Sequence, residues 1–131
     1  MTHSLFAYGT LQAPGIMERL LQRSIDTPEA AVLHGFQRTQ VKHAPFPGIQ
    51  PAETHQTQGA IYTNLTDNDL HTLDHYEGDL FQRIQVIAQT ATSPFRCWVY
   101  VIKPEHRDKL SKQDWSLSTF IENDLDNFLK Q

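Results

Sequence analysis

The chain has 131 residues and one cysteine, Cys97, so we expect residues 1–131 to form one domain without an internal disulfide. The net charge of −4 and the scattered lysine and arginine residues argue against a nucleic-acid partner. No apolar run approaches the ~20 residues of a membrane span, and the first residues lack a signal-peptide pattern. We therefore expect a cytoplasmic protein that has no membrane contact.

The first half of the chain predicts mainly strands. An apolar run at residues 5–8 indicates a short strand buried on both faces, and apolar residues at helical spacing indicate a helix at residues 16–23. Residues 30–41 alternate loosely and indicate one or two strands. Two prolines and a glycine predict a rigid turn at residues 45–49, and residues 58–63 alternate as a further strand.

The most informative segment is a predicted helix that follows Thr66. Thr66 suits the N-cap position, and Asp69 occupies the place of the capping-box partner. Gly78 can adopt the backbone conformation that ends a helix. These signals place the helix between Thr66 and Gly78.

Glu77 lies on the same face of this helix as Leu70 and Leu73, so we expect it to be directed toward the core. Burial and the negative end of the helix dipole both disfavour the charged carboxylate. The position therefore predicts a raised pKa, which suits a general acid and base. The alternative is a glutamate that caps the helix or forms a salt bridge.

The last third of the chain predicts two strands and a helix. Residues 81–88 alternate as a strand, residues 90–94 suit a hairpin loop, and residues 95–102 form the next strand. Asp114 or Ser116 can cap the final helix. Its apolar stripe consists of Leu117, Phe120, Ile121, Leu125, Phe128 and Leu129. This order of elements favours a small, mostly antiparallel sheet or partial barrel with flanking helices over a doubly wound sheet.

Three segments carry a family resemblance through their order and spacing. They are Phe6–Leu11, Phe46–Ile49 and Leu73–Gly78, and the last is followed by Phe81-Gln82-Arg83 and Val86. An Asp114-Trp115 pair also precedes the C-terminal helix. Together these segments resemble the gamma-glutamyl cyclotransferase-like superfamily, and within it the gamma-glutamylamine cyclotransferase and plant avirulence-induced-gene-like branches.

The resemblance implies an α+β fold, a small mixed, mostly antiparallel β-barrel with flanking helices. It also implies a reaction in which the α-amine of a small gamma-glutamyl amide attacks the side-chain carbonyl. The products are 5-oxoproline and a free amine or amino acid, and no cofactor or metal is required. The alternative is a non-catalytic protein that uses the same scaffold to bind a small metabolite or a partner.

The resemblance implies the site residues as well. Glu77 is the general acid and base, and the backbone N–H groups of the loop Tyr8-Gly9-Thr10-Leu11 hold the oxyanion and the substrate carboxylate. Without the family context, this loop is an ordinary strand-to-helix turn. Tyr100 either places its hydroxyl in the pocket, as its family counterpart does, or packs at the edge of the core.

Several neighbouring residues have open roles. Arg83 pairs either with Glu77 or with another acid, and Tyr76 points about 100° away from Glu77, which favours packing over reaction. Phe81 stands where many family members have tyrosine; if that hydroxyl contacts the substrate elsewhere in the family, the contact is lost here. Residues 44–49 and Phe95 are expected to shape the pocket mouth and hence the choice of leaving group.

Two other kinds of site receive little support from the sequence. His71 and His75 have the i, i+4 spacing of a zinc site, but the metalloprotease pattern is absent, which favours a solvated pair over a metal hydrolase. Cys97 lies between Phe95 and Trp98 in a predicted strand, where a buried small hydrophobe is favoured over a nucleophile.

Overall fold

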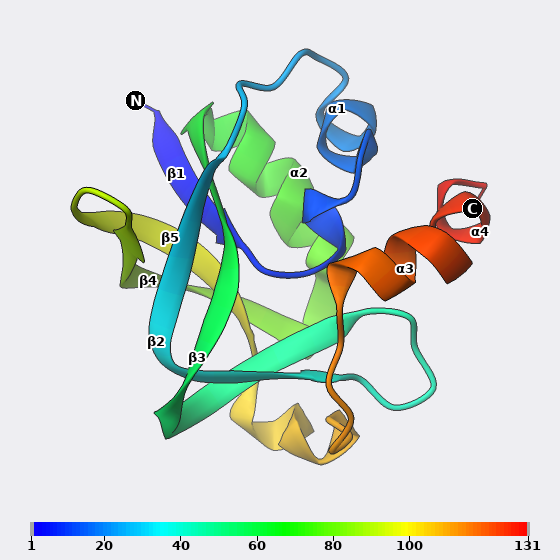
Figure 1. The fold of residues 1–131 in the computed structure, drawn as a ribbon. Helices are drawn as coiled ribbons and strands as arrows, with labels where there is room; N and C mark the ends of the chain where they lie inside the picture. Colours follow the sequence, from blue (N-terminus) through cyan, green and yellow to red (C-terminus); the bar gives the residue numbers. More distant parts are fainter. Residues whose placement is uncertain (1, 131) are drawn as a thin grey trace.

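The computed structural model describes residues 2–130, and its framework is a closed barrel of five strands in the order β1-β3-β2-β4-β5 (Figure 1). The strands are β1 (His3–Ala7), β2 (Glu29–Gln40), β3 (Pro47–Leu65), β4 (Phe81–Thr90) and β5 (Pro94–Ile102). Strand β1 runs parallel to β5, and the other neighbouring pairs are antiparallel. The prediction of a mixed, mostly antiparallel barrel with flanking helices is confirmed.

Helices flank the barrel in the part of the chain that the structure describes. The α-helices are α1 (Ile16–Leu21), α2 (Asp67–Glu77), α3 (Leu117–Asn123) and α4 (Leu125–Leu129). The shorter 3-10 helices are η1 (Thr10–Gln12), η2 (Gly78–Leu80) and η3 (Pro104–Lys109). No helix among residues 2–130 is long and apolar enough to cross a membrane.

Buried side chains form two clusters on opposite faces of β1, as the apolar run predicted. Phe6 belongs to a cluster with residues from all five strands and none from the α-helices, so this cluster fills the barrel. Leu5 belongs to the other cluster, where Met17 and Leu73 attach α1 and α2 to the outside of the barrel. Successive residues of a strand point to opposite faces, which explains the division.

Strands β2 and β3 form one long hairpin. Strand β2 matches the predicted residues 30–41 to within one residue, and β3 is longer than the strand predicted at residues 58–63. The rigid turn predicted at residues 45–49 is partly wrong. The turn lies at residues 42–46, and Pro47 already pairs with Gln40 as the first residue of β3. Proline is tolerated at that position in a strand. The polar stretch of β3 at residues 50–58 lacks alternation because most of its side chains are exposed.

Helix α2 begins and ends where its capping residues predict. The Thr66 side chain accepts a hydrogen bond from the Asp69 N–H at 3.0 Å, and the Asp69 carboxylate accepts one from the Thr66 N–H at 2.9 Å. Gly78 follows the helix with φ of +75°, a conformation that favours glycine. Leu70 and Leu73 are buried, which fixes the face that α2 turns toward the barrel.

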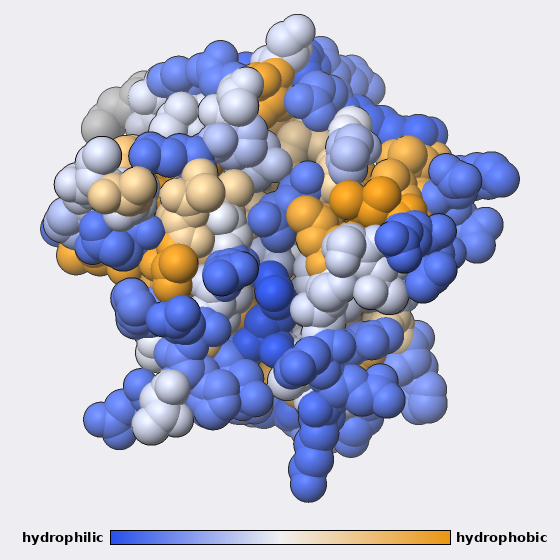
Figure 2. All heavy atoms as spheres, in the orientation of Figure 1, coloured by the Kyte–Doolittle hydropathy of each residue, from blue (hydrophilic) through white to orange (hydrophobic). Residues whose placement is uncertain are grey.

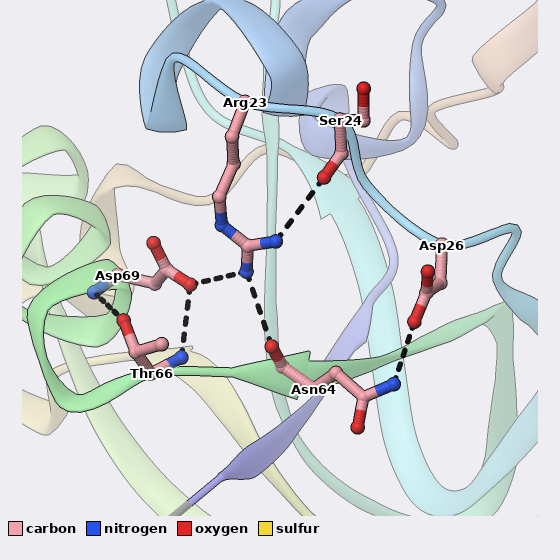
Figure 3. A network of polar contacts seen from close by, with 6 residues as sticks. All are labelled: Arg23, Ser24, Asp26, Asn64, Thr66 and Asp69. Atoms are coloured by element: carbon pink, nitrogen blue, oxygen red, sulfur yellow. Dashed lines mark hydrogen bonds and ion pairs between the residues drawn. The ribbon is translucent and has the colours of Figure 1, made fainter.

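The start of α2 is also tied to the segment after α1 (Figure 3). Arg23 donates to the Asp69 carboxylate and, at 3.1 Å, to the Asn64 carbonyl oxygen. The Asn64 side-chain amide in turn donates to Asp26 at 2.6 Å. Because Asp69 also closes the capping box, one carboxylate joins the helix start to a distant loop.

The C-terminal segment forms two short helices instead of one. Ser116, one of the two predicted caps, accepts a hydrogen bond from the Thr119 N–H at 3.1 Å, and the helix breaks at Asp124. Phe120 is buried between the rings of Trp115 and Phe128. Ile121, also part of the predicted apolar stripe, is 36% exposed. It lies about 100° around the helix from Phe120, which takes the inward direction.

Candidate active site

A pocket of about 260 Å³ is lined by residues of the loop after β1 and of the C-terminal end of α2. Its polar lining comes from Tyr8, Gly9, Thr10, Tyr76, Glu77 and Tyr100. Its apolar lining includes Phe6, Leu11, Phe46, Pro47, Phe81 and Phe128. All residues that the resemblance implied for the site therefore line one pocket, although their roles remain predictions.

Glu77 is the last residue of α2 and brings a carboxyl group to this pocket. The residue as a whole is half-buried, but its carboxyl group lies in the shielded part of the site. Burial, followed by the nearby charge of Asp74, raises the pKa of Glu77 to about 8. A carboxyl group with this pKa exchanges protons near neutral pH, as a general acid and base must.

Asp74 lies three residues before Glu77 and has a different environment. Arg83 donates to its two carboxylate oxygens, at 2.7 and 3.0 Å, and the Tyr100 hydroxyl donates at 2.7 Å. Burial alone would raise the pKa of Asp74, but these hydrogen bonds and the Arg83 charge outweigh it and lower the pKa. The guanidinium of Arg83 also lies 4.2 Å from the centre of the Trp98 ring.

The sequence left open whether Arg83 pairs with Glu77 or with another acid, and its partner is Asp74. Asp74 was not predicted as part of the site. Its i, i+3 spacing from Glu77 was a usable signal, because residues at this spacing are neighbours on a helix. The ion pair leaves Asp74 charged beside Glu77, whose own carboxyl group favours the neutral form.

Tyr100 both lines the pocket and packs in the core, the two roles that the sequence left open. The residue is 4% exposed and lines the pocket, and its hydroxyl donates to Asp74. Burial, the hydrogen bond to Asp74 and the nearby negative charges raise the pKa of Tyr100, so the hydroxyl keeps its proton and acts as a donor. This geometry supports a positioning role through Asp74.

The loop after β1 is held from three sides. The Tyr8 hydroxyl donates to the Tyr100 carbonyl oxygen at 2.6 Å, and Arg38 donates to the Tyr8 carbonyl oxygen at 2.8 Å. A Cβ atom at Gly9 would lie 3.0 Å from Cγ of Pro47, so glycine permits this close approach. The loop continues into η1, and the first N–H groups of a helix have no partner within it.

Aromatic side chains form the remaining wall of the pocket. Phe128 of α4 packs edge-on against Tyr76, with 6.4 Å between ring centroids and 73° between ring planes. Phe81, which replaces the tyrosine of many family members, is buried. Its ring centroid lies 6.3 Å from that of Phe46. Tyr76 packs, as predicted, and it also lines the pocket. Phe128 was not foreseen here, because a stripe on a distant helix does not reveal what it covers.

The prediction of which residues shape the pocket mouth is partly wrong. Phe46 and Pro47, from the predicted segment 44–49, line the pocket. Phe95 packs against the cluster inside the barrel instead, and it is not part of the pocket lining, so its expected role there is wrong. Its position in β5, on the hairpin that joins β4 to β5, explains the difference.

The two alternative sites gain no support from the residues the structure describes. His71 and His75 are both exposed, and no group of three or more potential metal ligands occurs among residues 2–130. Cys97 is buried within the barrel, and burial raises the pKa of its thiol to about 11. A thiol in this environment suits packing more than nucleophilic attack.

The fold and the site define a class of protein: a five-stranded barrel with a pocket that holds one carboxyl group of raised pKa. Residues 5–117 match the family described as gamma-glutamyl cyclotransferase, AIG2-like. The chain belongs to this family. The superfamily prediction is therefore confirmed.

Individual relatives agree with this assignment. The chain is 33% identical over 85 residues to Protein AIG2 C of Arabidopsis thaliana, covering 65% of this chain and about half, 51%, of that protein. It is 30% identical over 129 residues to AIG2-like protein C of the same plant, covering 97% and 74%. A solution structure from Arabidopsis thaliana shares the fold, with a TM-score of 0.77 at 24% identity and coverage of 99% and 79%.

Proposed function

We propose that this protein is a gamma-glutamyl amide cyclotransferase with Glu77 as its general acid and base. One observation carries the proposal. A carboxyl group with a pKa of about 8 lies in a pocket beside the loop Tyr8-Gly9-Thr10-Leu11. The family description supports the reaction class. The pocket volume of about 260 Å³ lies just below the roughly 300–1,000 Å³ of sites for drug-sized ligands, so the pocket suits a smaller metabolite.

The reaction places two demands on one side chain. The α-ammonium group of the substrate first releases a proton to solvent. The resulting amine nitrogen forms a bond to the γ-carbonyl carbon, and the ionised Glu77 takes a second proton from that nitrogen. Protonated Glu77 then delivers this proton to the leaving nitrogen as its bond to carbon breaks. The products are 5-oxoproline and the free amine, and Glu77 returns to its starting state.

The carbonyl oxygen becomes negatively charged during the attack and needs hydrogen-bond donors. We assign this task, and the binding of the substrate carboxylate, to backbone N–H groups of Gly9, Thr10 and Leu11. Fixed donors of this kind need no reorganisation during the reaction. The anchoring of Tyr8 through Arg38 and Tyr100 supports such a fixed geometry.

Because nucleophile and electrophile belong to one molecule, the pocket mainly has to hold the substrate in a bent shape. Gly9 and Pro47 both line this pocket, and a Cβ atom at Gly9 would lie 3.0 Å from Cγ of Pro47. The proton transfers through Glu77 add on the order of 10²–10⁴ in rate.

The test is release of 5-oxoproline from gamma-glutamyl alkylamides, gamma-glutamyl amino acids and gamma-glutamyl-lysine amides. Wild type and Glu122→Gln, which changes an exposed acid of α3, are expected to release it at equal rates. Glu77→Gln is expected to lose at least about 100-fold. Absence of release from every substrate, with all proteins folded, would contradict the proposal. Stabilisation by 5-oxoproline in that case would favour the non-catalytic binding protein.

A further inference from the structure

We propose that Arg38 is a positioning residue of the reaction, which fixes and polarises the peptide group between Tyr8 and Gly9. The N–H of that peptide group is one of the donors assigned to the oxyanion, so the inference rests on the proposed function and adds the residue that controls this donor. The hydrogen bonds of Arg38, its place outside the pocket and its contact with Trp115 support it.

Arg38 of β2 holds the loop after β1 from outside the pocket. One terminal nitrogen of its guanidinium donates to the Tyr8 carbonyl oxygen at 2.8 Å and to the Gln58 carbonyl oxygen of β3 at 3.0 Å. Tyr8 and Gly9 line the pocket, whereas Arg38 does not. The side chain therefore joins two strands to the loop, and any effect on the substrate passes through the loop.

The peptide group between Tyr8 and Gly9 transmits this contact. A trans peptide group is planar, and its N–H points opposite to its C=O. Because a residue outside the pocket binds the Tyr8 carbonyl oxygen, we expect the Gly9 N–H to point to the pocket side. Arg38 therefore sets the direction of that N–H without touching the substrate.

The next peptide group of the loop is held in the same way. The Gly9 carbonyl oxygen accepts hydrogen bonds from the Gln12 N–H at 3.1 Å and from the Gln12 side-chain amide at 3.3 Å. Among residues 2–130, neither the Gly9 N–H nor the Thr10 N–H donates to another backbone group. The carbonyl groups of this loop are thus bound, and the N–H groups beside them remain available to a ligand.

The positive charge of Arg38 strengthens the donor as well as orienting it. A hydrogen bond from a cation to a carbonyl oxygen is stronger than a neutral one, and it polarises the peptide group so that its N–H becomes a better donor. Burial lowers the pKa of Arg38, and the nearby charge of Asp114 opposes this effect. A guanidinium still keeps its charge at neutral pH. A fixed and polarised N–H is the kind of donor that stabilises an oxyanion.

Trp115 confines the guanidinium to this position. Arg38 lies over the ring of buried Trp115, 5.5 Å from the ring centre. The ring N–H of Trp115 donates to the Pro45 carbonyl oxygen at 2.8 Å, which holds the ring on the β2–β3 turn. Figure 2 shows hydrophilic residues over the middle of this face, where the loop after β1 lies near the β2–β3 hairpin in Figure 1. The Asp114-Trp115 pair therefore keeps the charge of Arg38 beside the loop.

The experiment measures 5-oxoproline release from the gamma-glutamyl amide of the panel that wild type converts fastest. Arg38→Gln is expected to lower kcat at least about tenfold, a part of the 10²–10³ that removal of a whole oxyanion donor costs, with a smaller change in KM. Arg38→Lys keeps a charged donor and is expected to recover part of this loss. Arg96→Gln removes an exposed arginine of β5 and serves as the matched control with wild-type rates.

A second measurement does not depend on turnover. In nitrogen-15 NMR of the substrate-free protein, the Gly9 amide resonance reports the polarisation of its peptide group. It is expected to shift in Arg38→Gln, to return toward the wild-type position in Arg38→Lys and to stay unchanged in Arg96→Gln. The same spectra give the folded fraction of each variant, and kcat is expressed per folded protein.

Equal kcat in Arg38→Gln and wild type would overturn the inference. An equal loss in Arg38→Gln and Arg38→Lys would do the same, since the charge would then have no part in the effect. A loss of kcat with an unshifted Gly9 resonance would also overturn it, because the effect would not pass through this peptide group. Each of these results leaves the cyclotransferase reaction intact. Absence of 5-oxoproline with folded wild type overturns the proposed function itself.

Discussion

Asp74 and Glu77 lie three residues apart on α2, yet the pKa values of their carboxyl groups are shifted in opposite directions. Hydrogen bonds from Arg83 and Tyr100 lower the pKa of Asp74 against the effect of burial. Burial and the charge of Asp74 raise the pKa of Glu77 to about 8. Two acids with pKa values pushed apart are the usual arrangement for acid–base chemistry near neutral pH.

Asp74→Asn is expected to lower the pKa of Glu77, because it removes the neighbouring negative charge. If Glu77 is the base, the acidic limb of the pH profile of kcat/KM for 5-oxoproline release moves below 8. Arg83→Gln provides the opposing variant. It removes the cation that partly neutralises Asp74, so the same limb is expected to move upward. Shifts of both variants in one direction would contradict electrostatic coupling between the two acids.

Glu77 is also expected to make stability depend on pH. Its pKa is raised from 4.5 to about 8 in the folded protein, so the folded state binds more protons between these values. The resulting stabilisation is complete below pH 4.5 and is lost as the pH rises toward 8. The pKa difference corresponds to at most roughly 5 kcal/mol, at about 1.4 kcal/mol per unit.

Urea unfolding of wild type and Glu77→Gln at several pH values between 5 and 9 measures this contribution. The free energy of unfolding of wild type is expected to fall across this window relative to that of Glu77→Gln. A constant difference between the two proteins would contradict the raised pKa.

Gly9→Ala is expected to reduce kcat/KM, because the new Cβ atom would lie 3.0 Å from Cγ of Pro47 and displace the loop. Pro47→Ala in the same protein removes that contact and is expected to restore part of the rate. Gly15→Ala is the matched control. Gly15 has φ of +83° and no atom near its Cβ position, so this variant loses about 1 kcal/mol of stability without a change in KM. Equal kinetics in Gly9→Ala and wild type would show that the contact does not shape the pocket.

Tyr100→Phe separates a positioning role from substrate contact. The hydroxyl donates to Asp74, so its loss is expected to cost about 1 kcal/mol in the free energy of unfolding and to leave KM close to that of wild type. Unfolding and steady-state kinetics on one preparation provide both values. A large rise in KM with unchanged stability would instead indicate that Tyr100 binds the substrate directly.

Signals within a few residues were enough to predict helix α2. Elsewhere the structure depends on contacts between residues far apart in the sequence, which the local pattern did not predict. Thr66, Asp69 and Gly78 define the helix through contacts within a few residues, so the sequence pattern was sufficient. Pro47 was assigned to a turn because proline and glycine favour turns locally. Its pairing with Gln40 across the hairpin decided otherwise.

The same contrast applies to the site. The direction of Glu77 followed from its spacing to Leu70 and Leu73, and the family motif indicated the loop after β1. Phe128 reaches the pocket because the C-terminal segment breaks at Asp124 and places the Phe128 ring against Tyr76 of α2, a feature that no local pattern revealed. The partner of Arg83 required the register between β4 and β5, which brings Arg83 opposite Tyr100.

The central claim is that the Glu77 carboxyl group binds a proton near neutral pH within the pocket. Carbon-13 NMR of protein labelled at its glutamate side chains, titrated from pH 4 to 10, measures this directly, and the Glu77→Gln spectrum identifies the signal. The account predicts a midpoint for Glu77 at about 8. A midpoint near the ordinary value of 4.5 would contradict it.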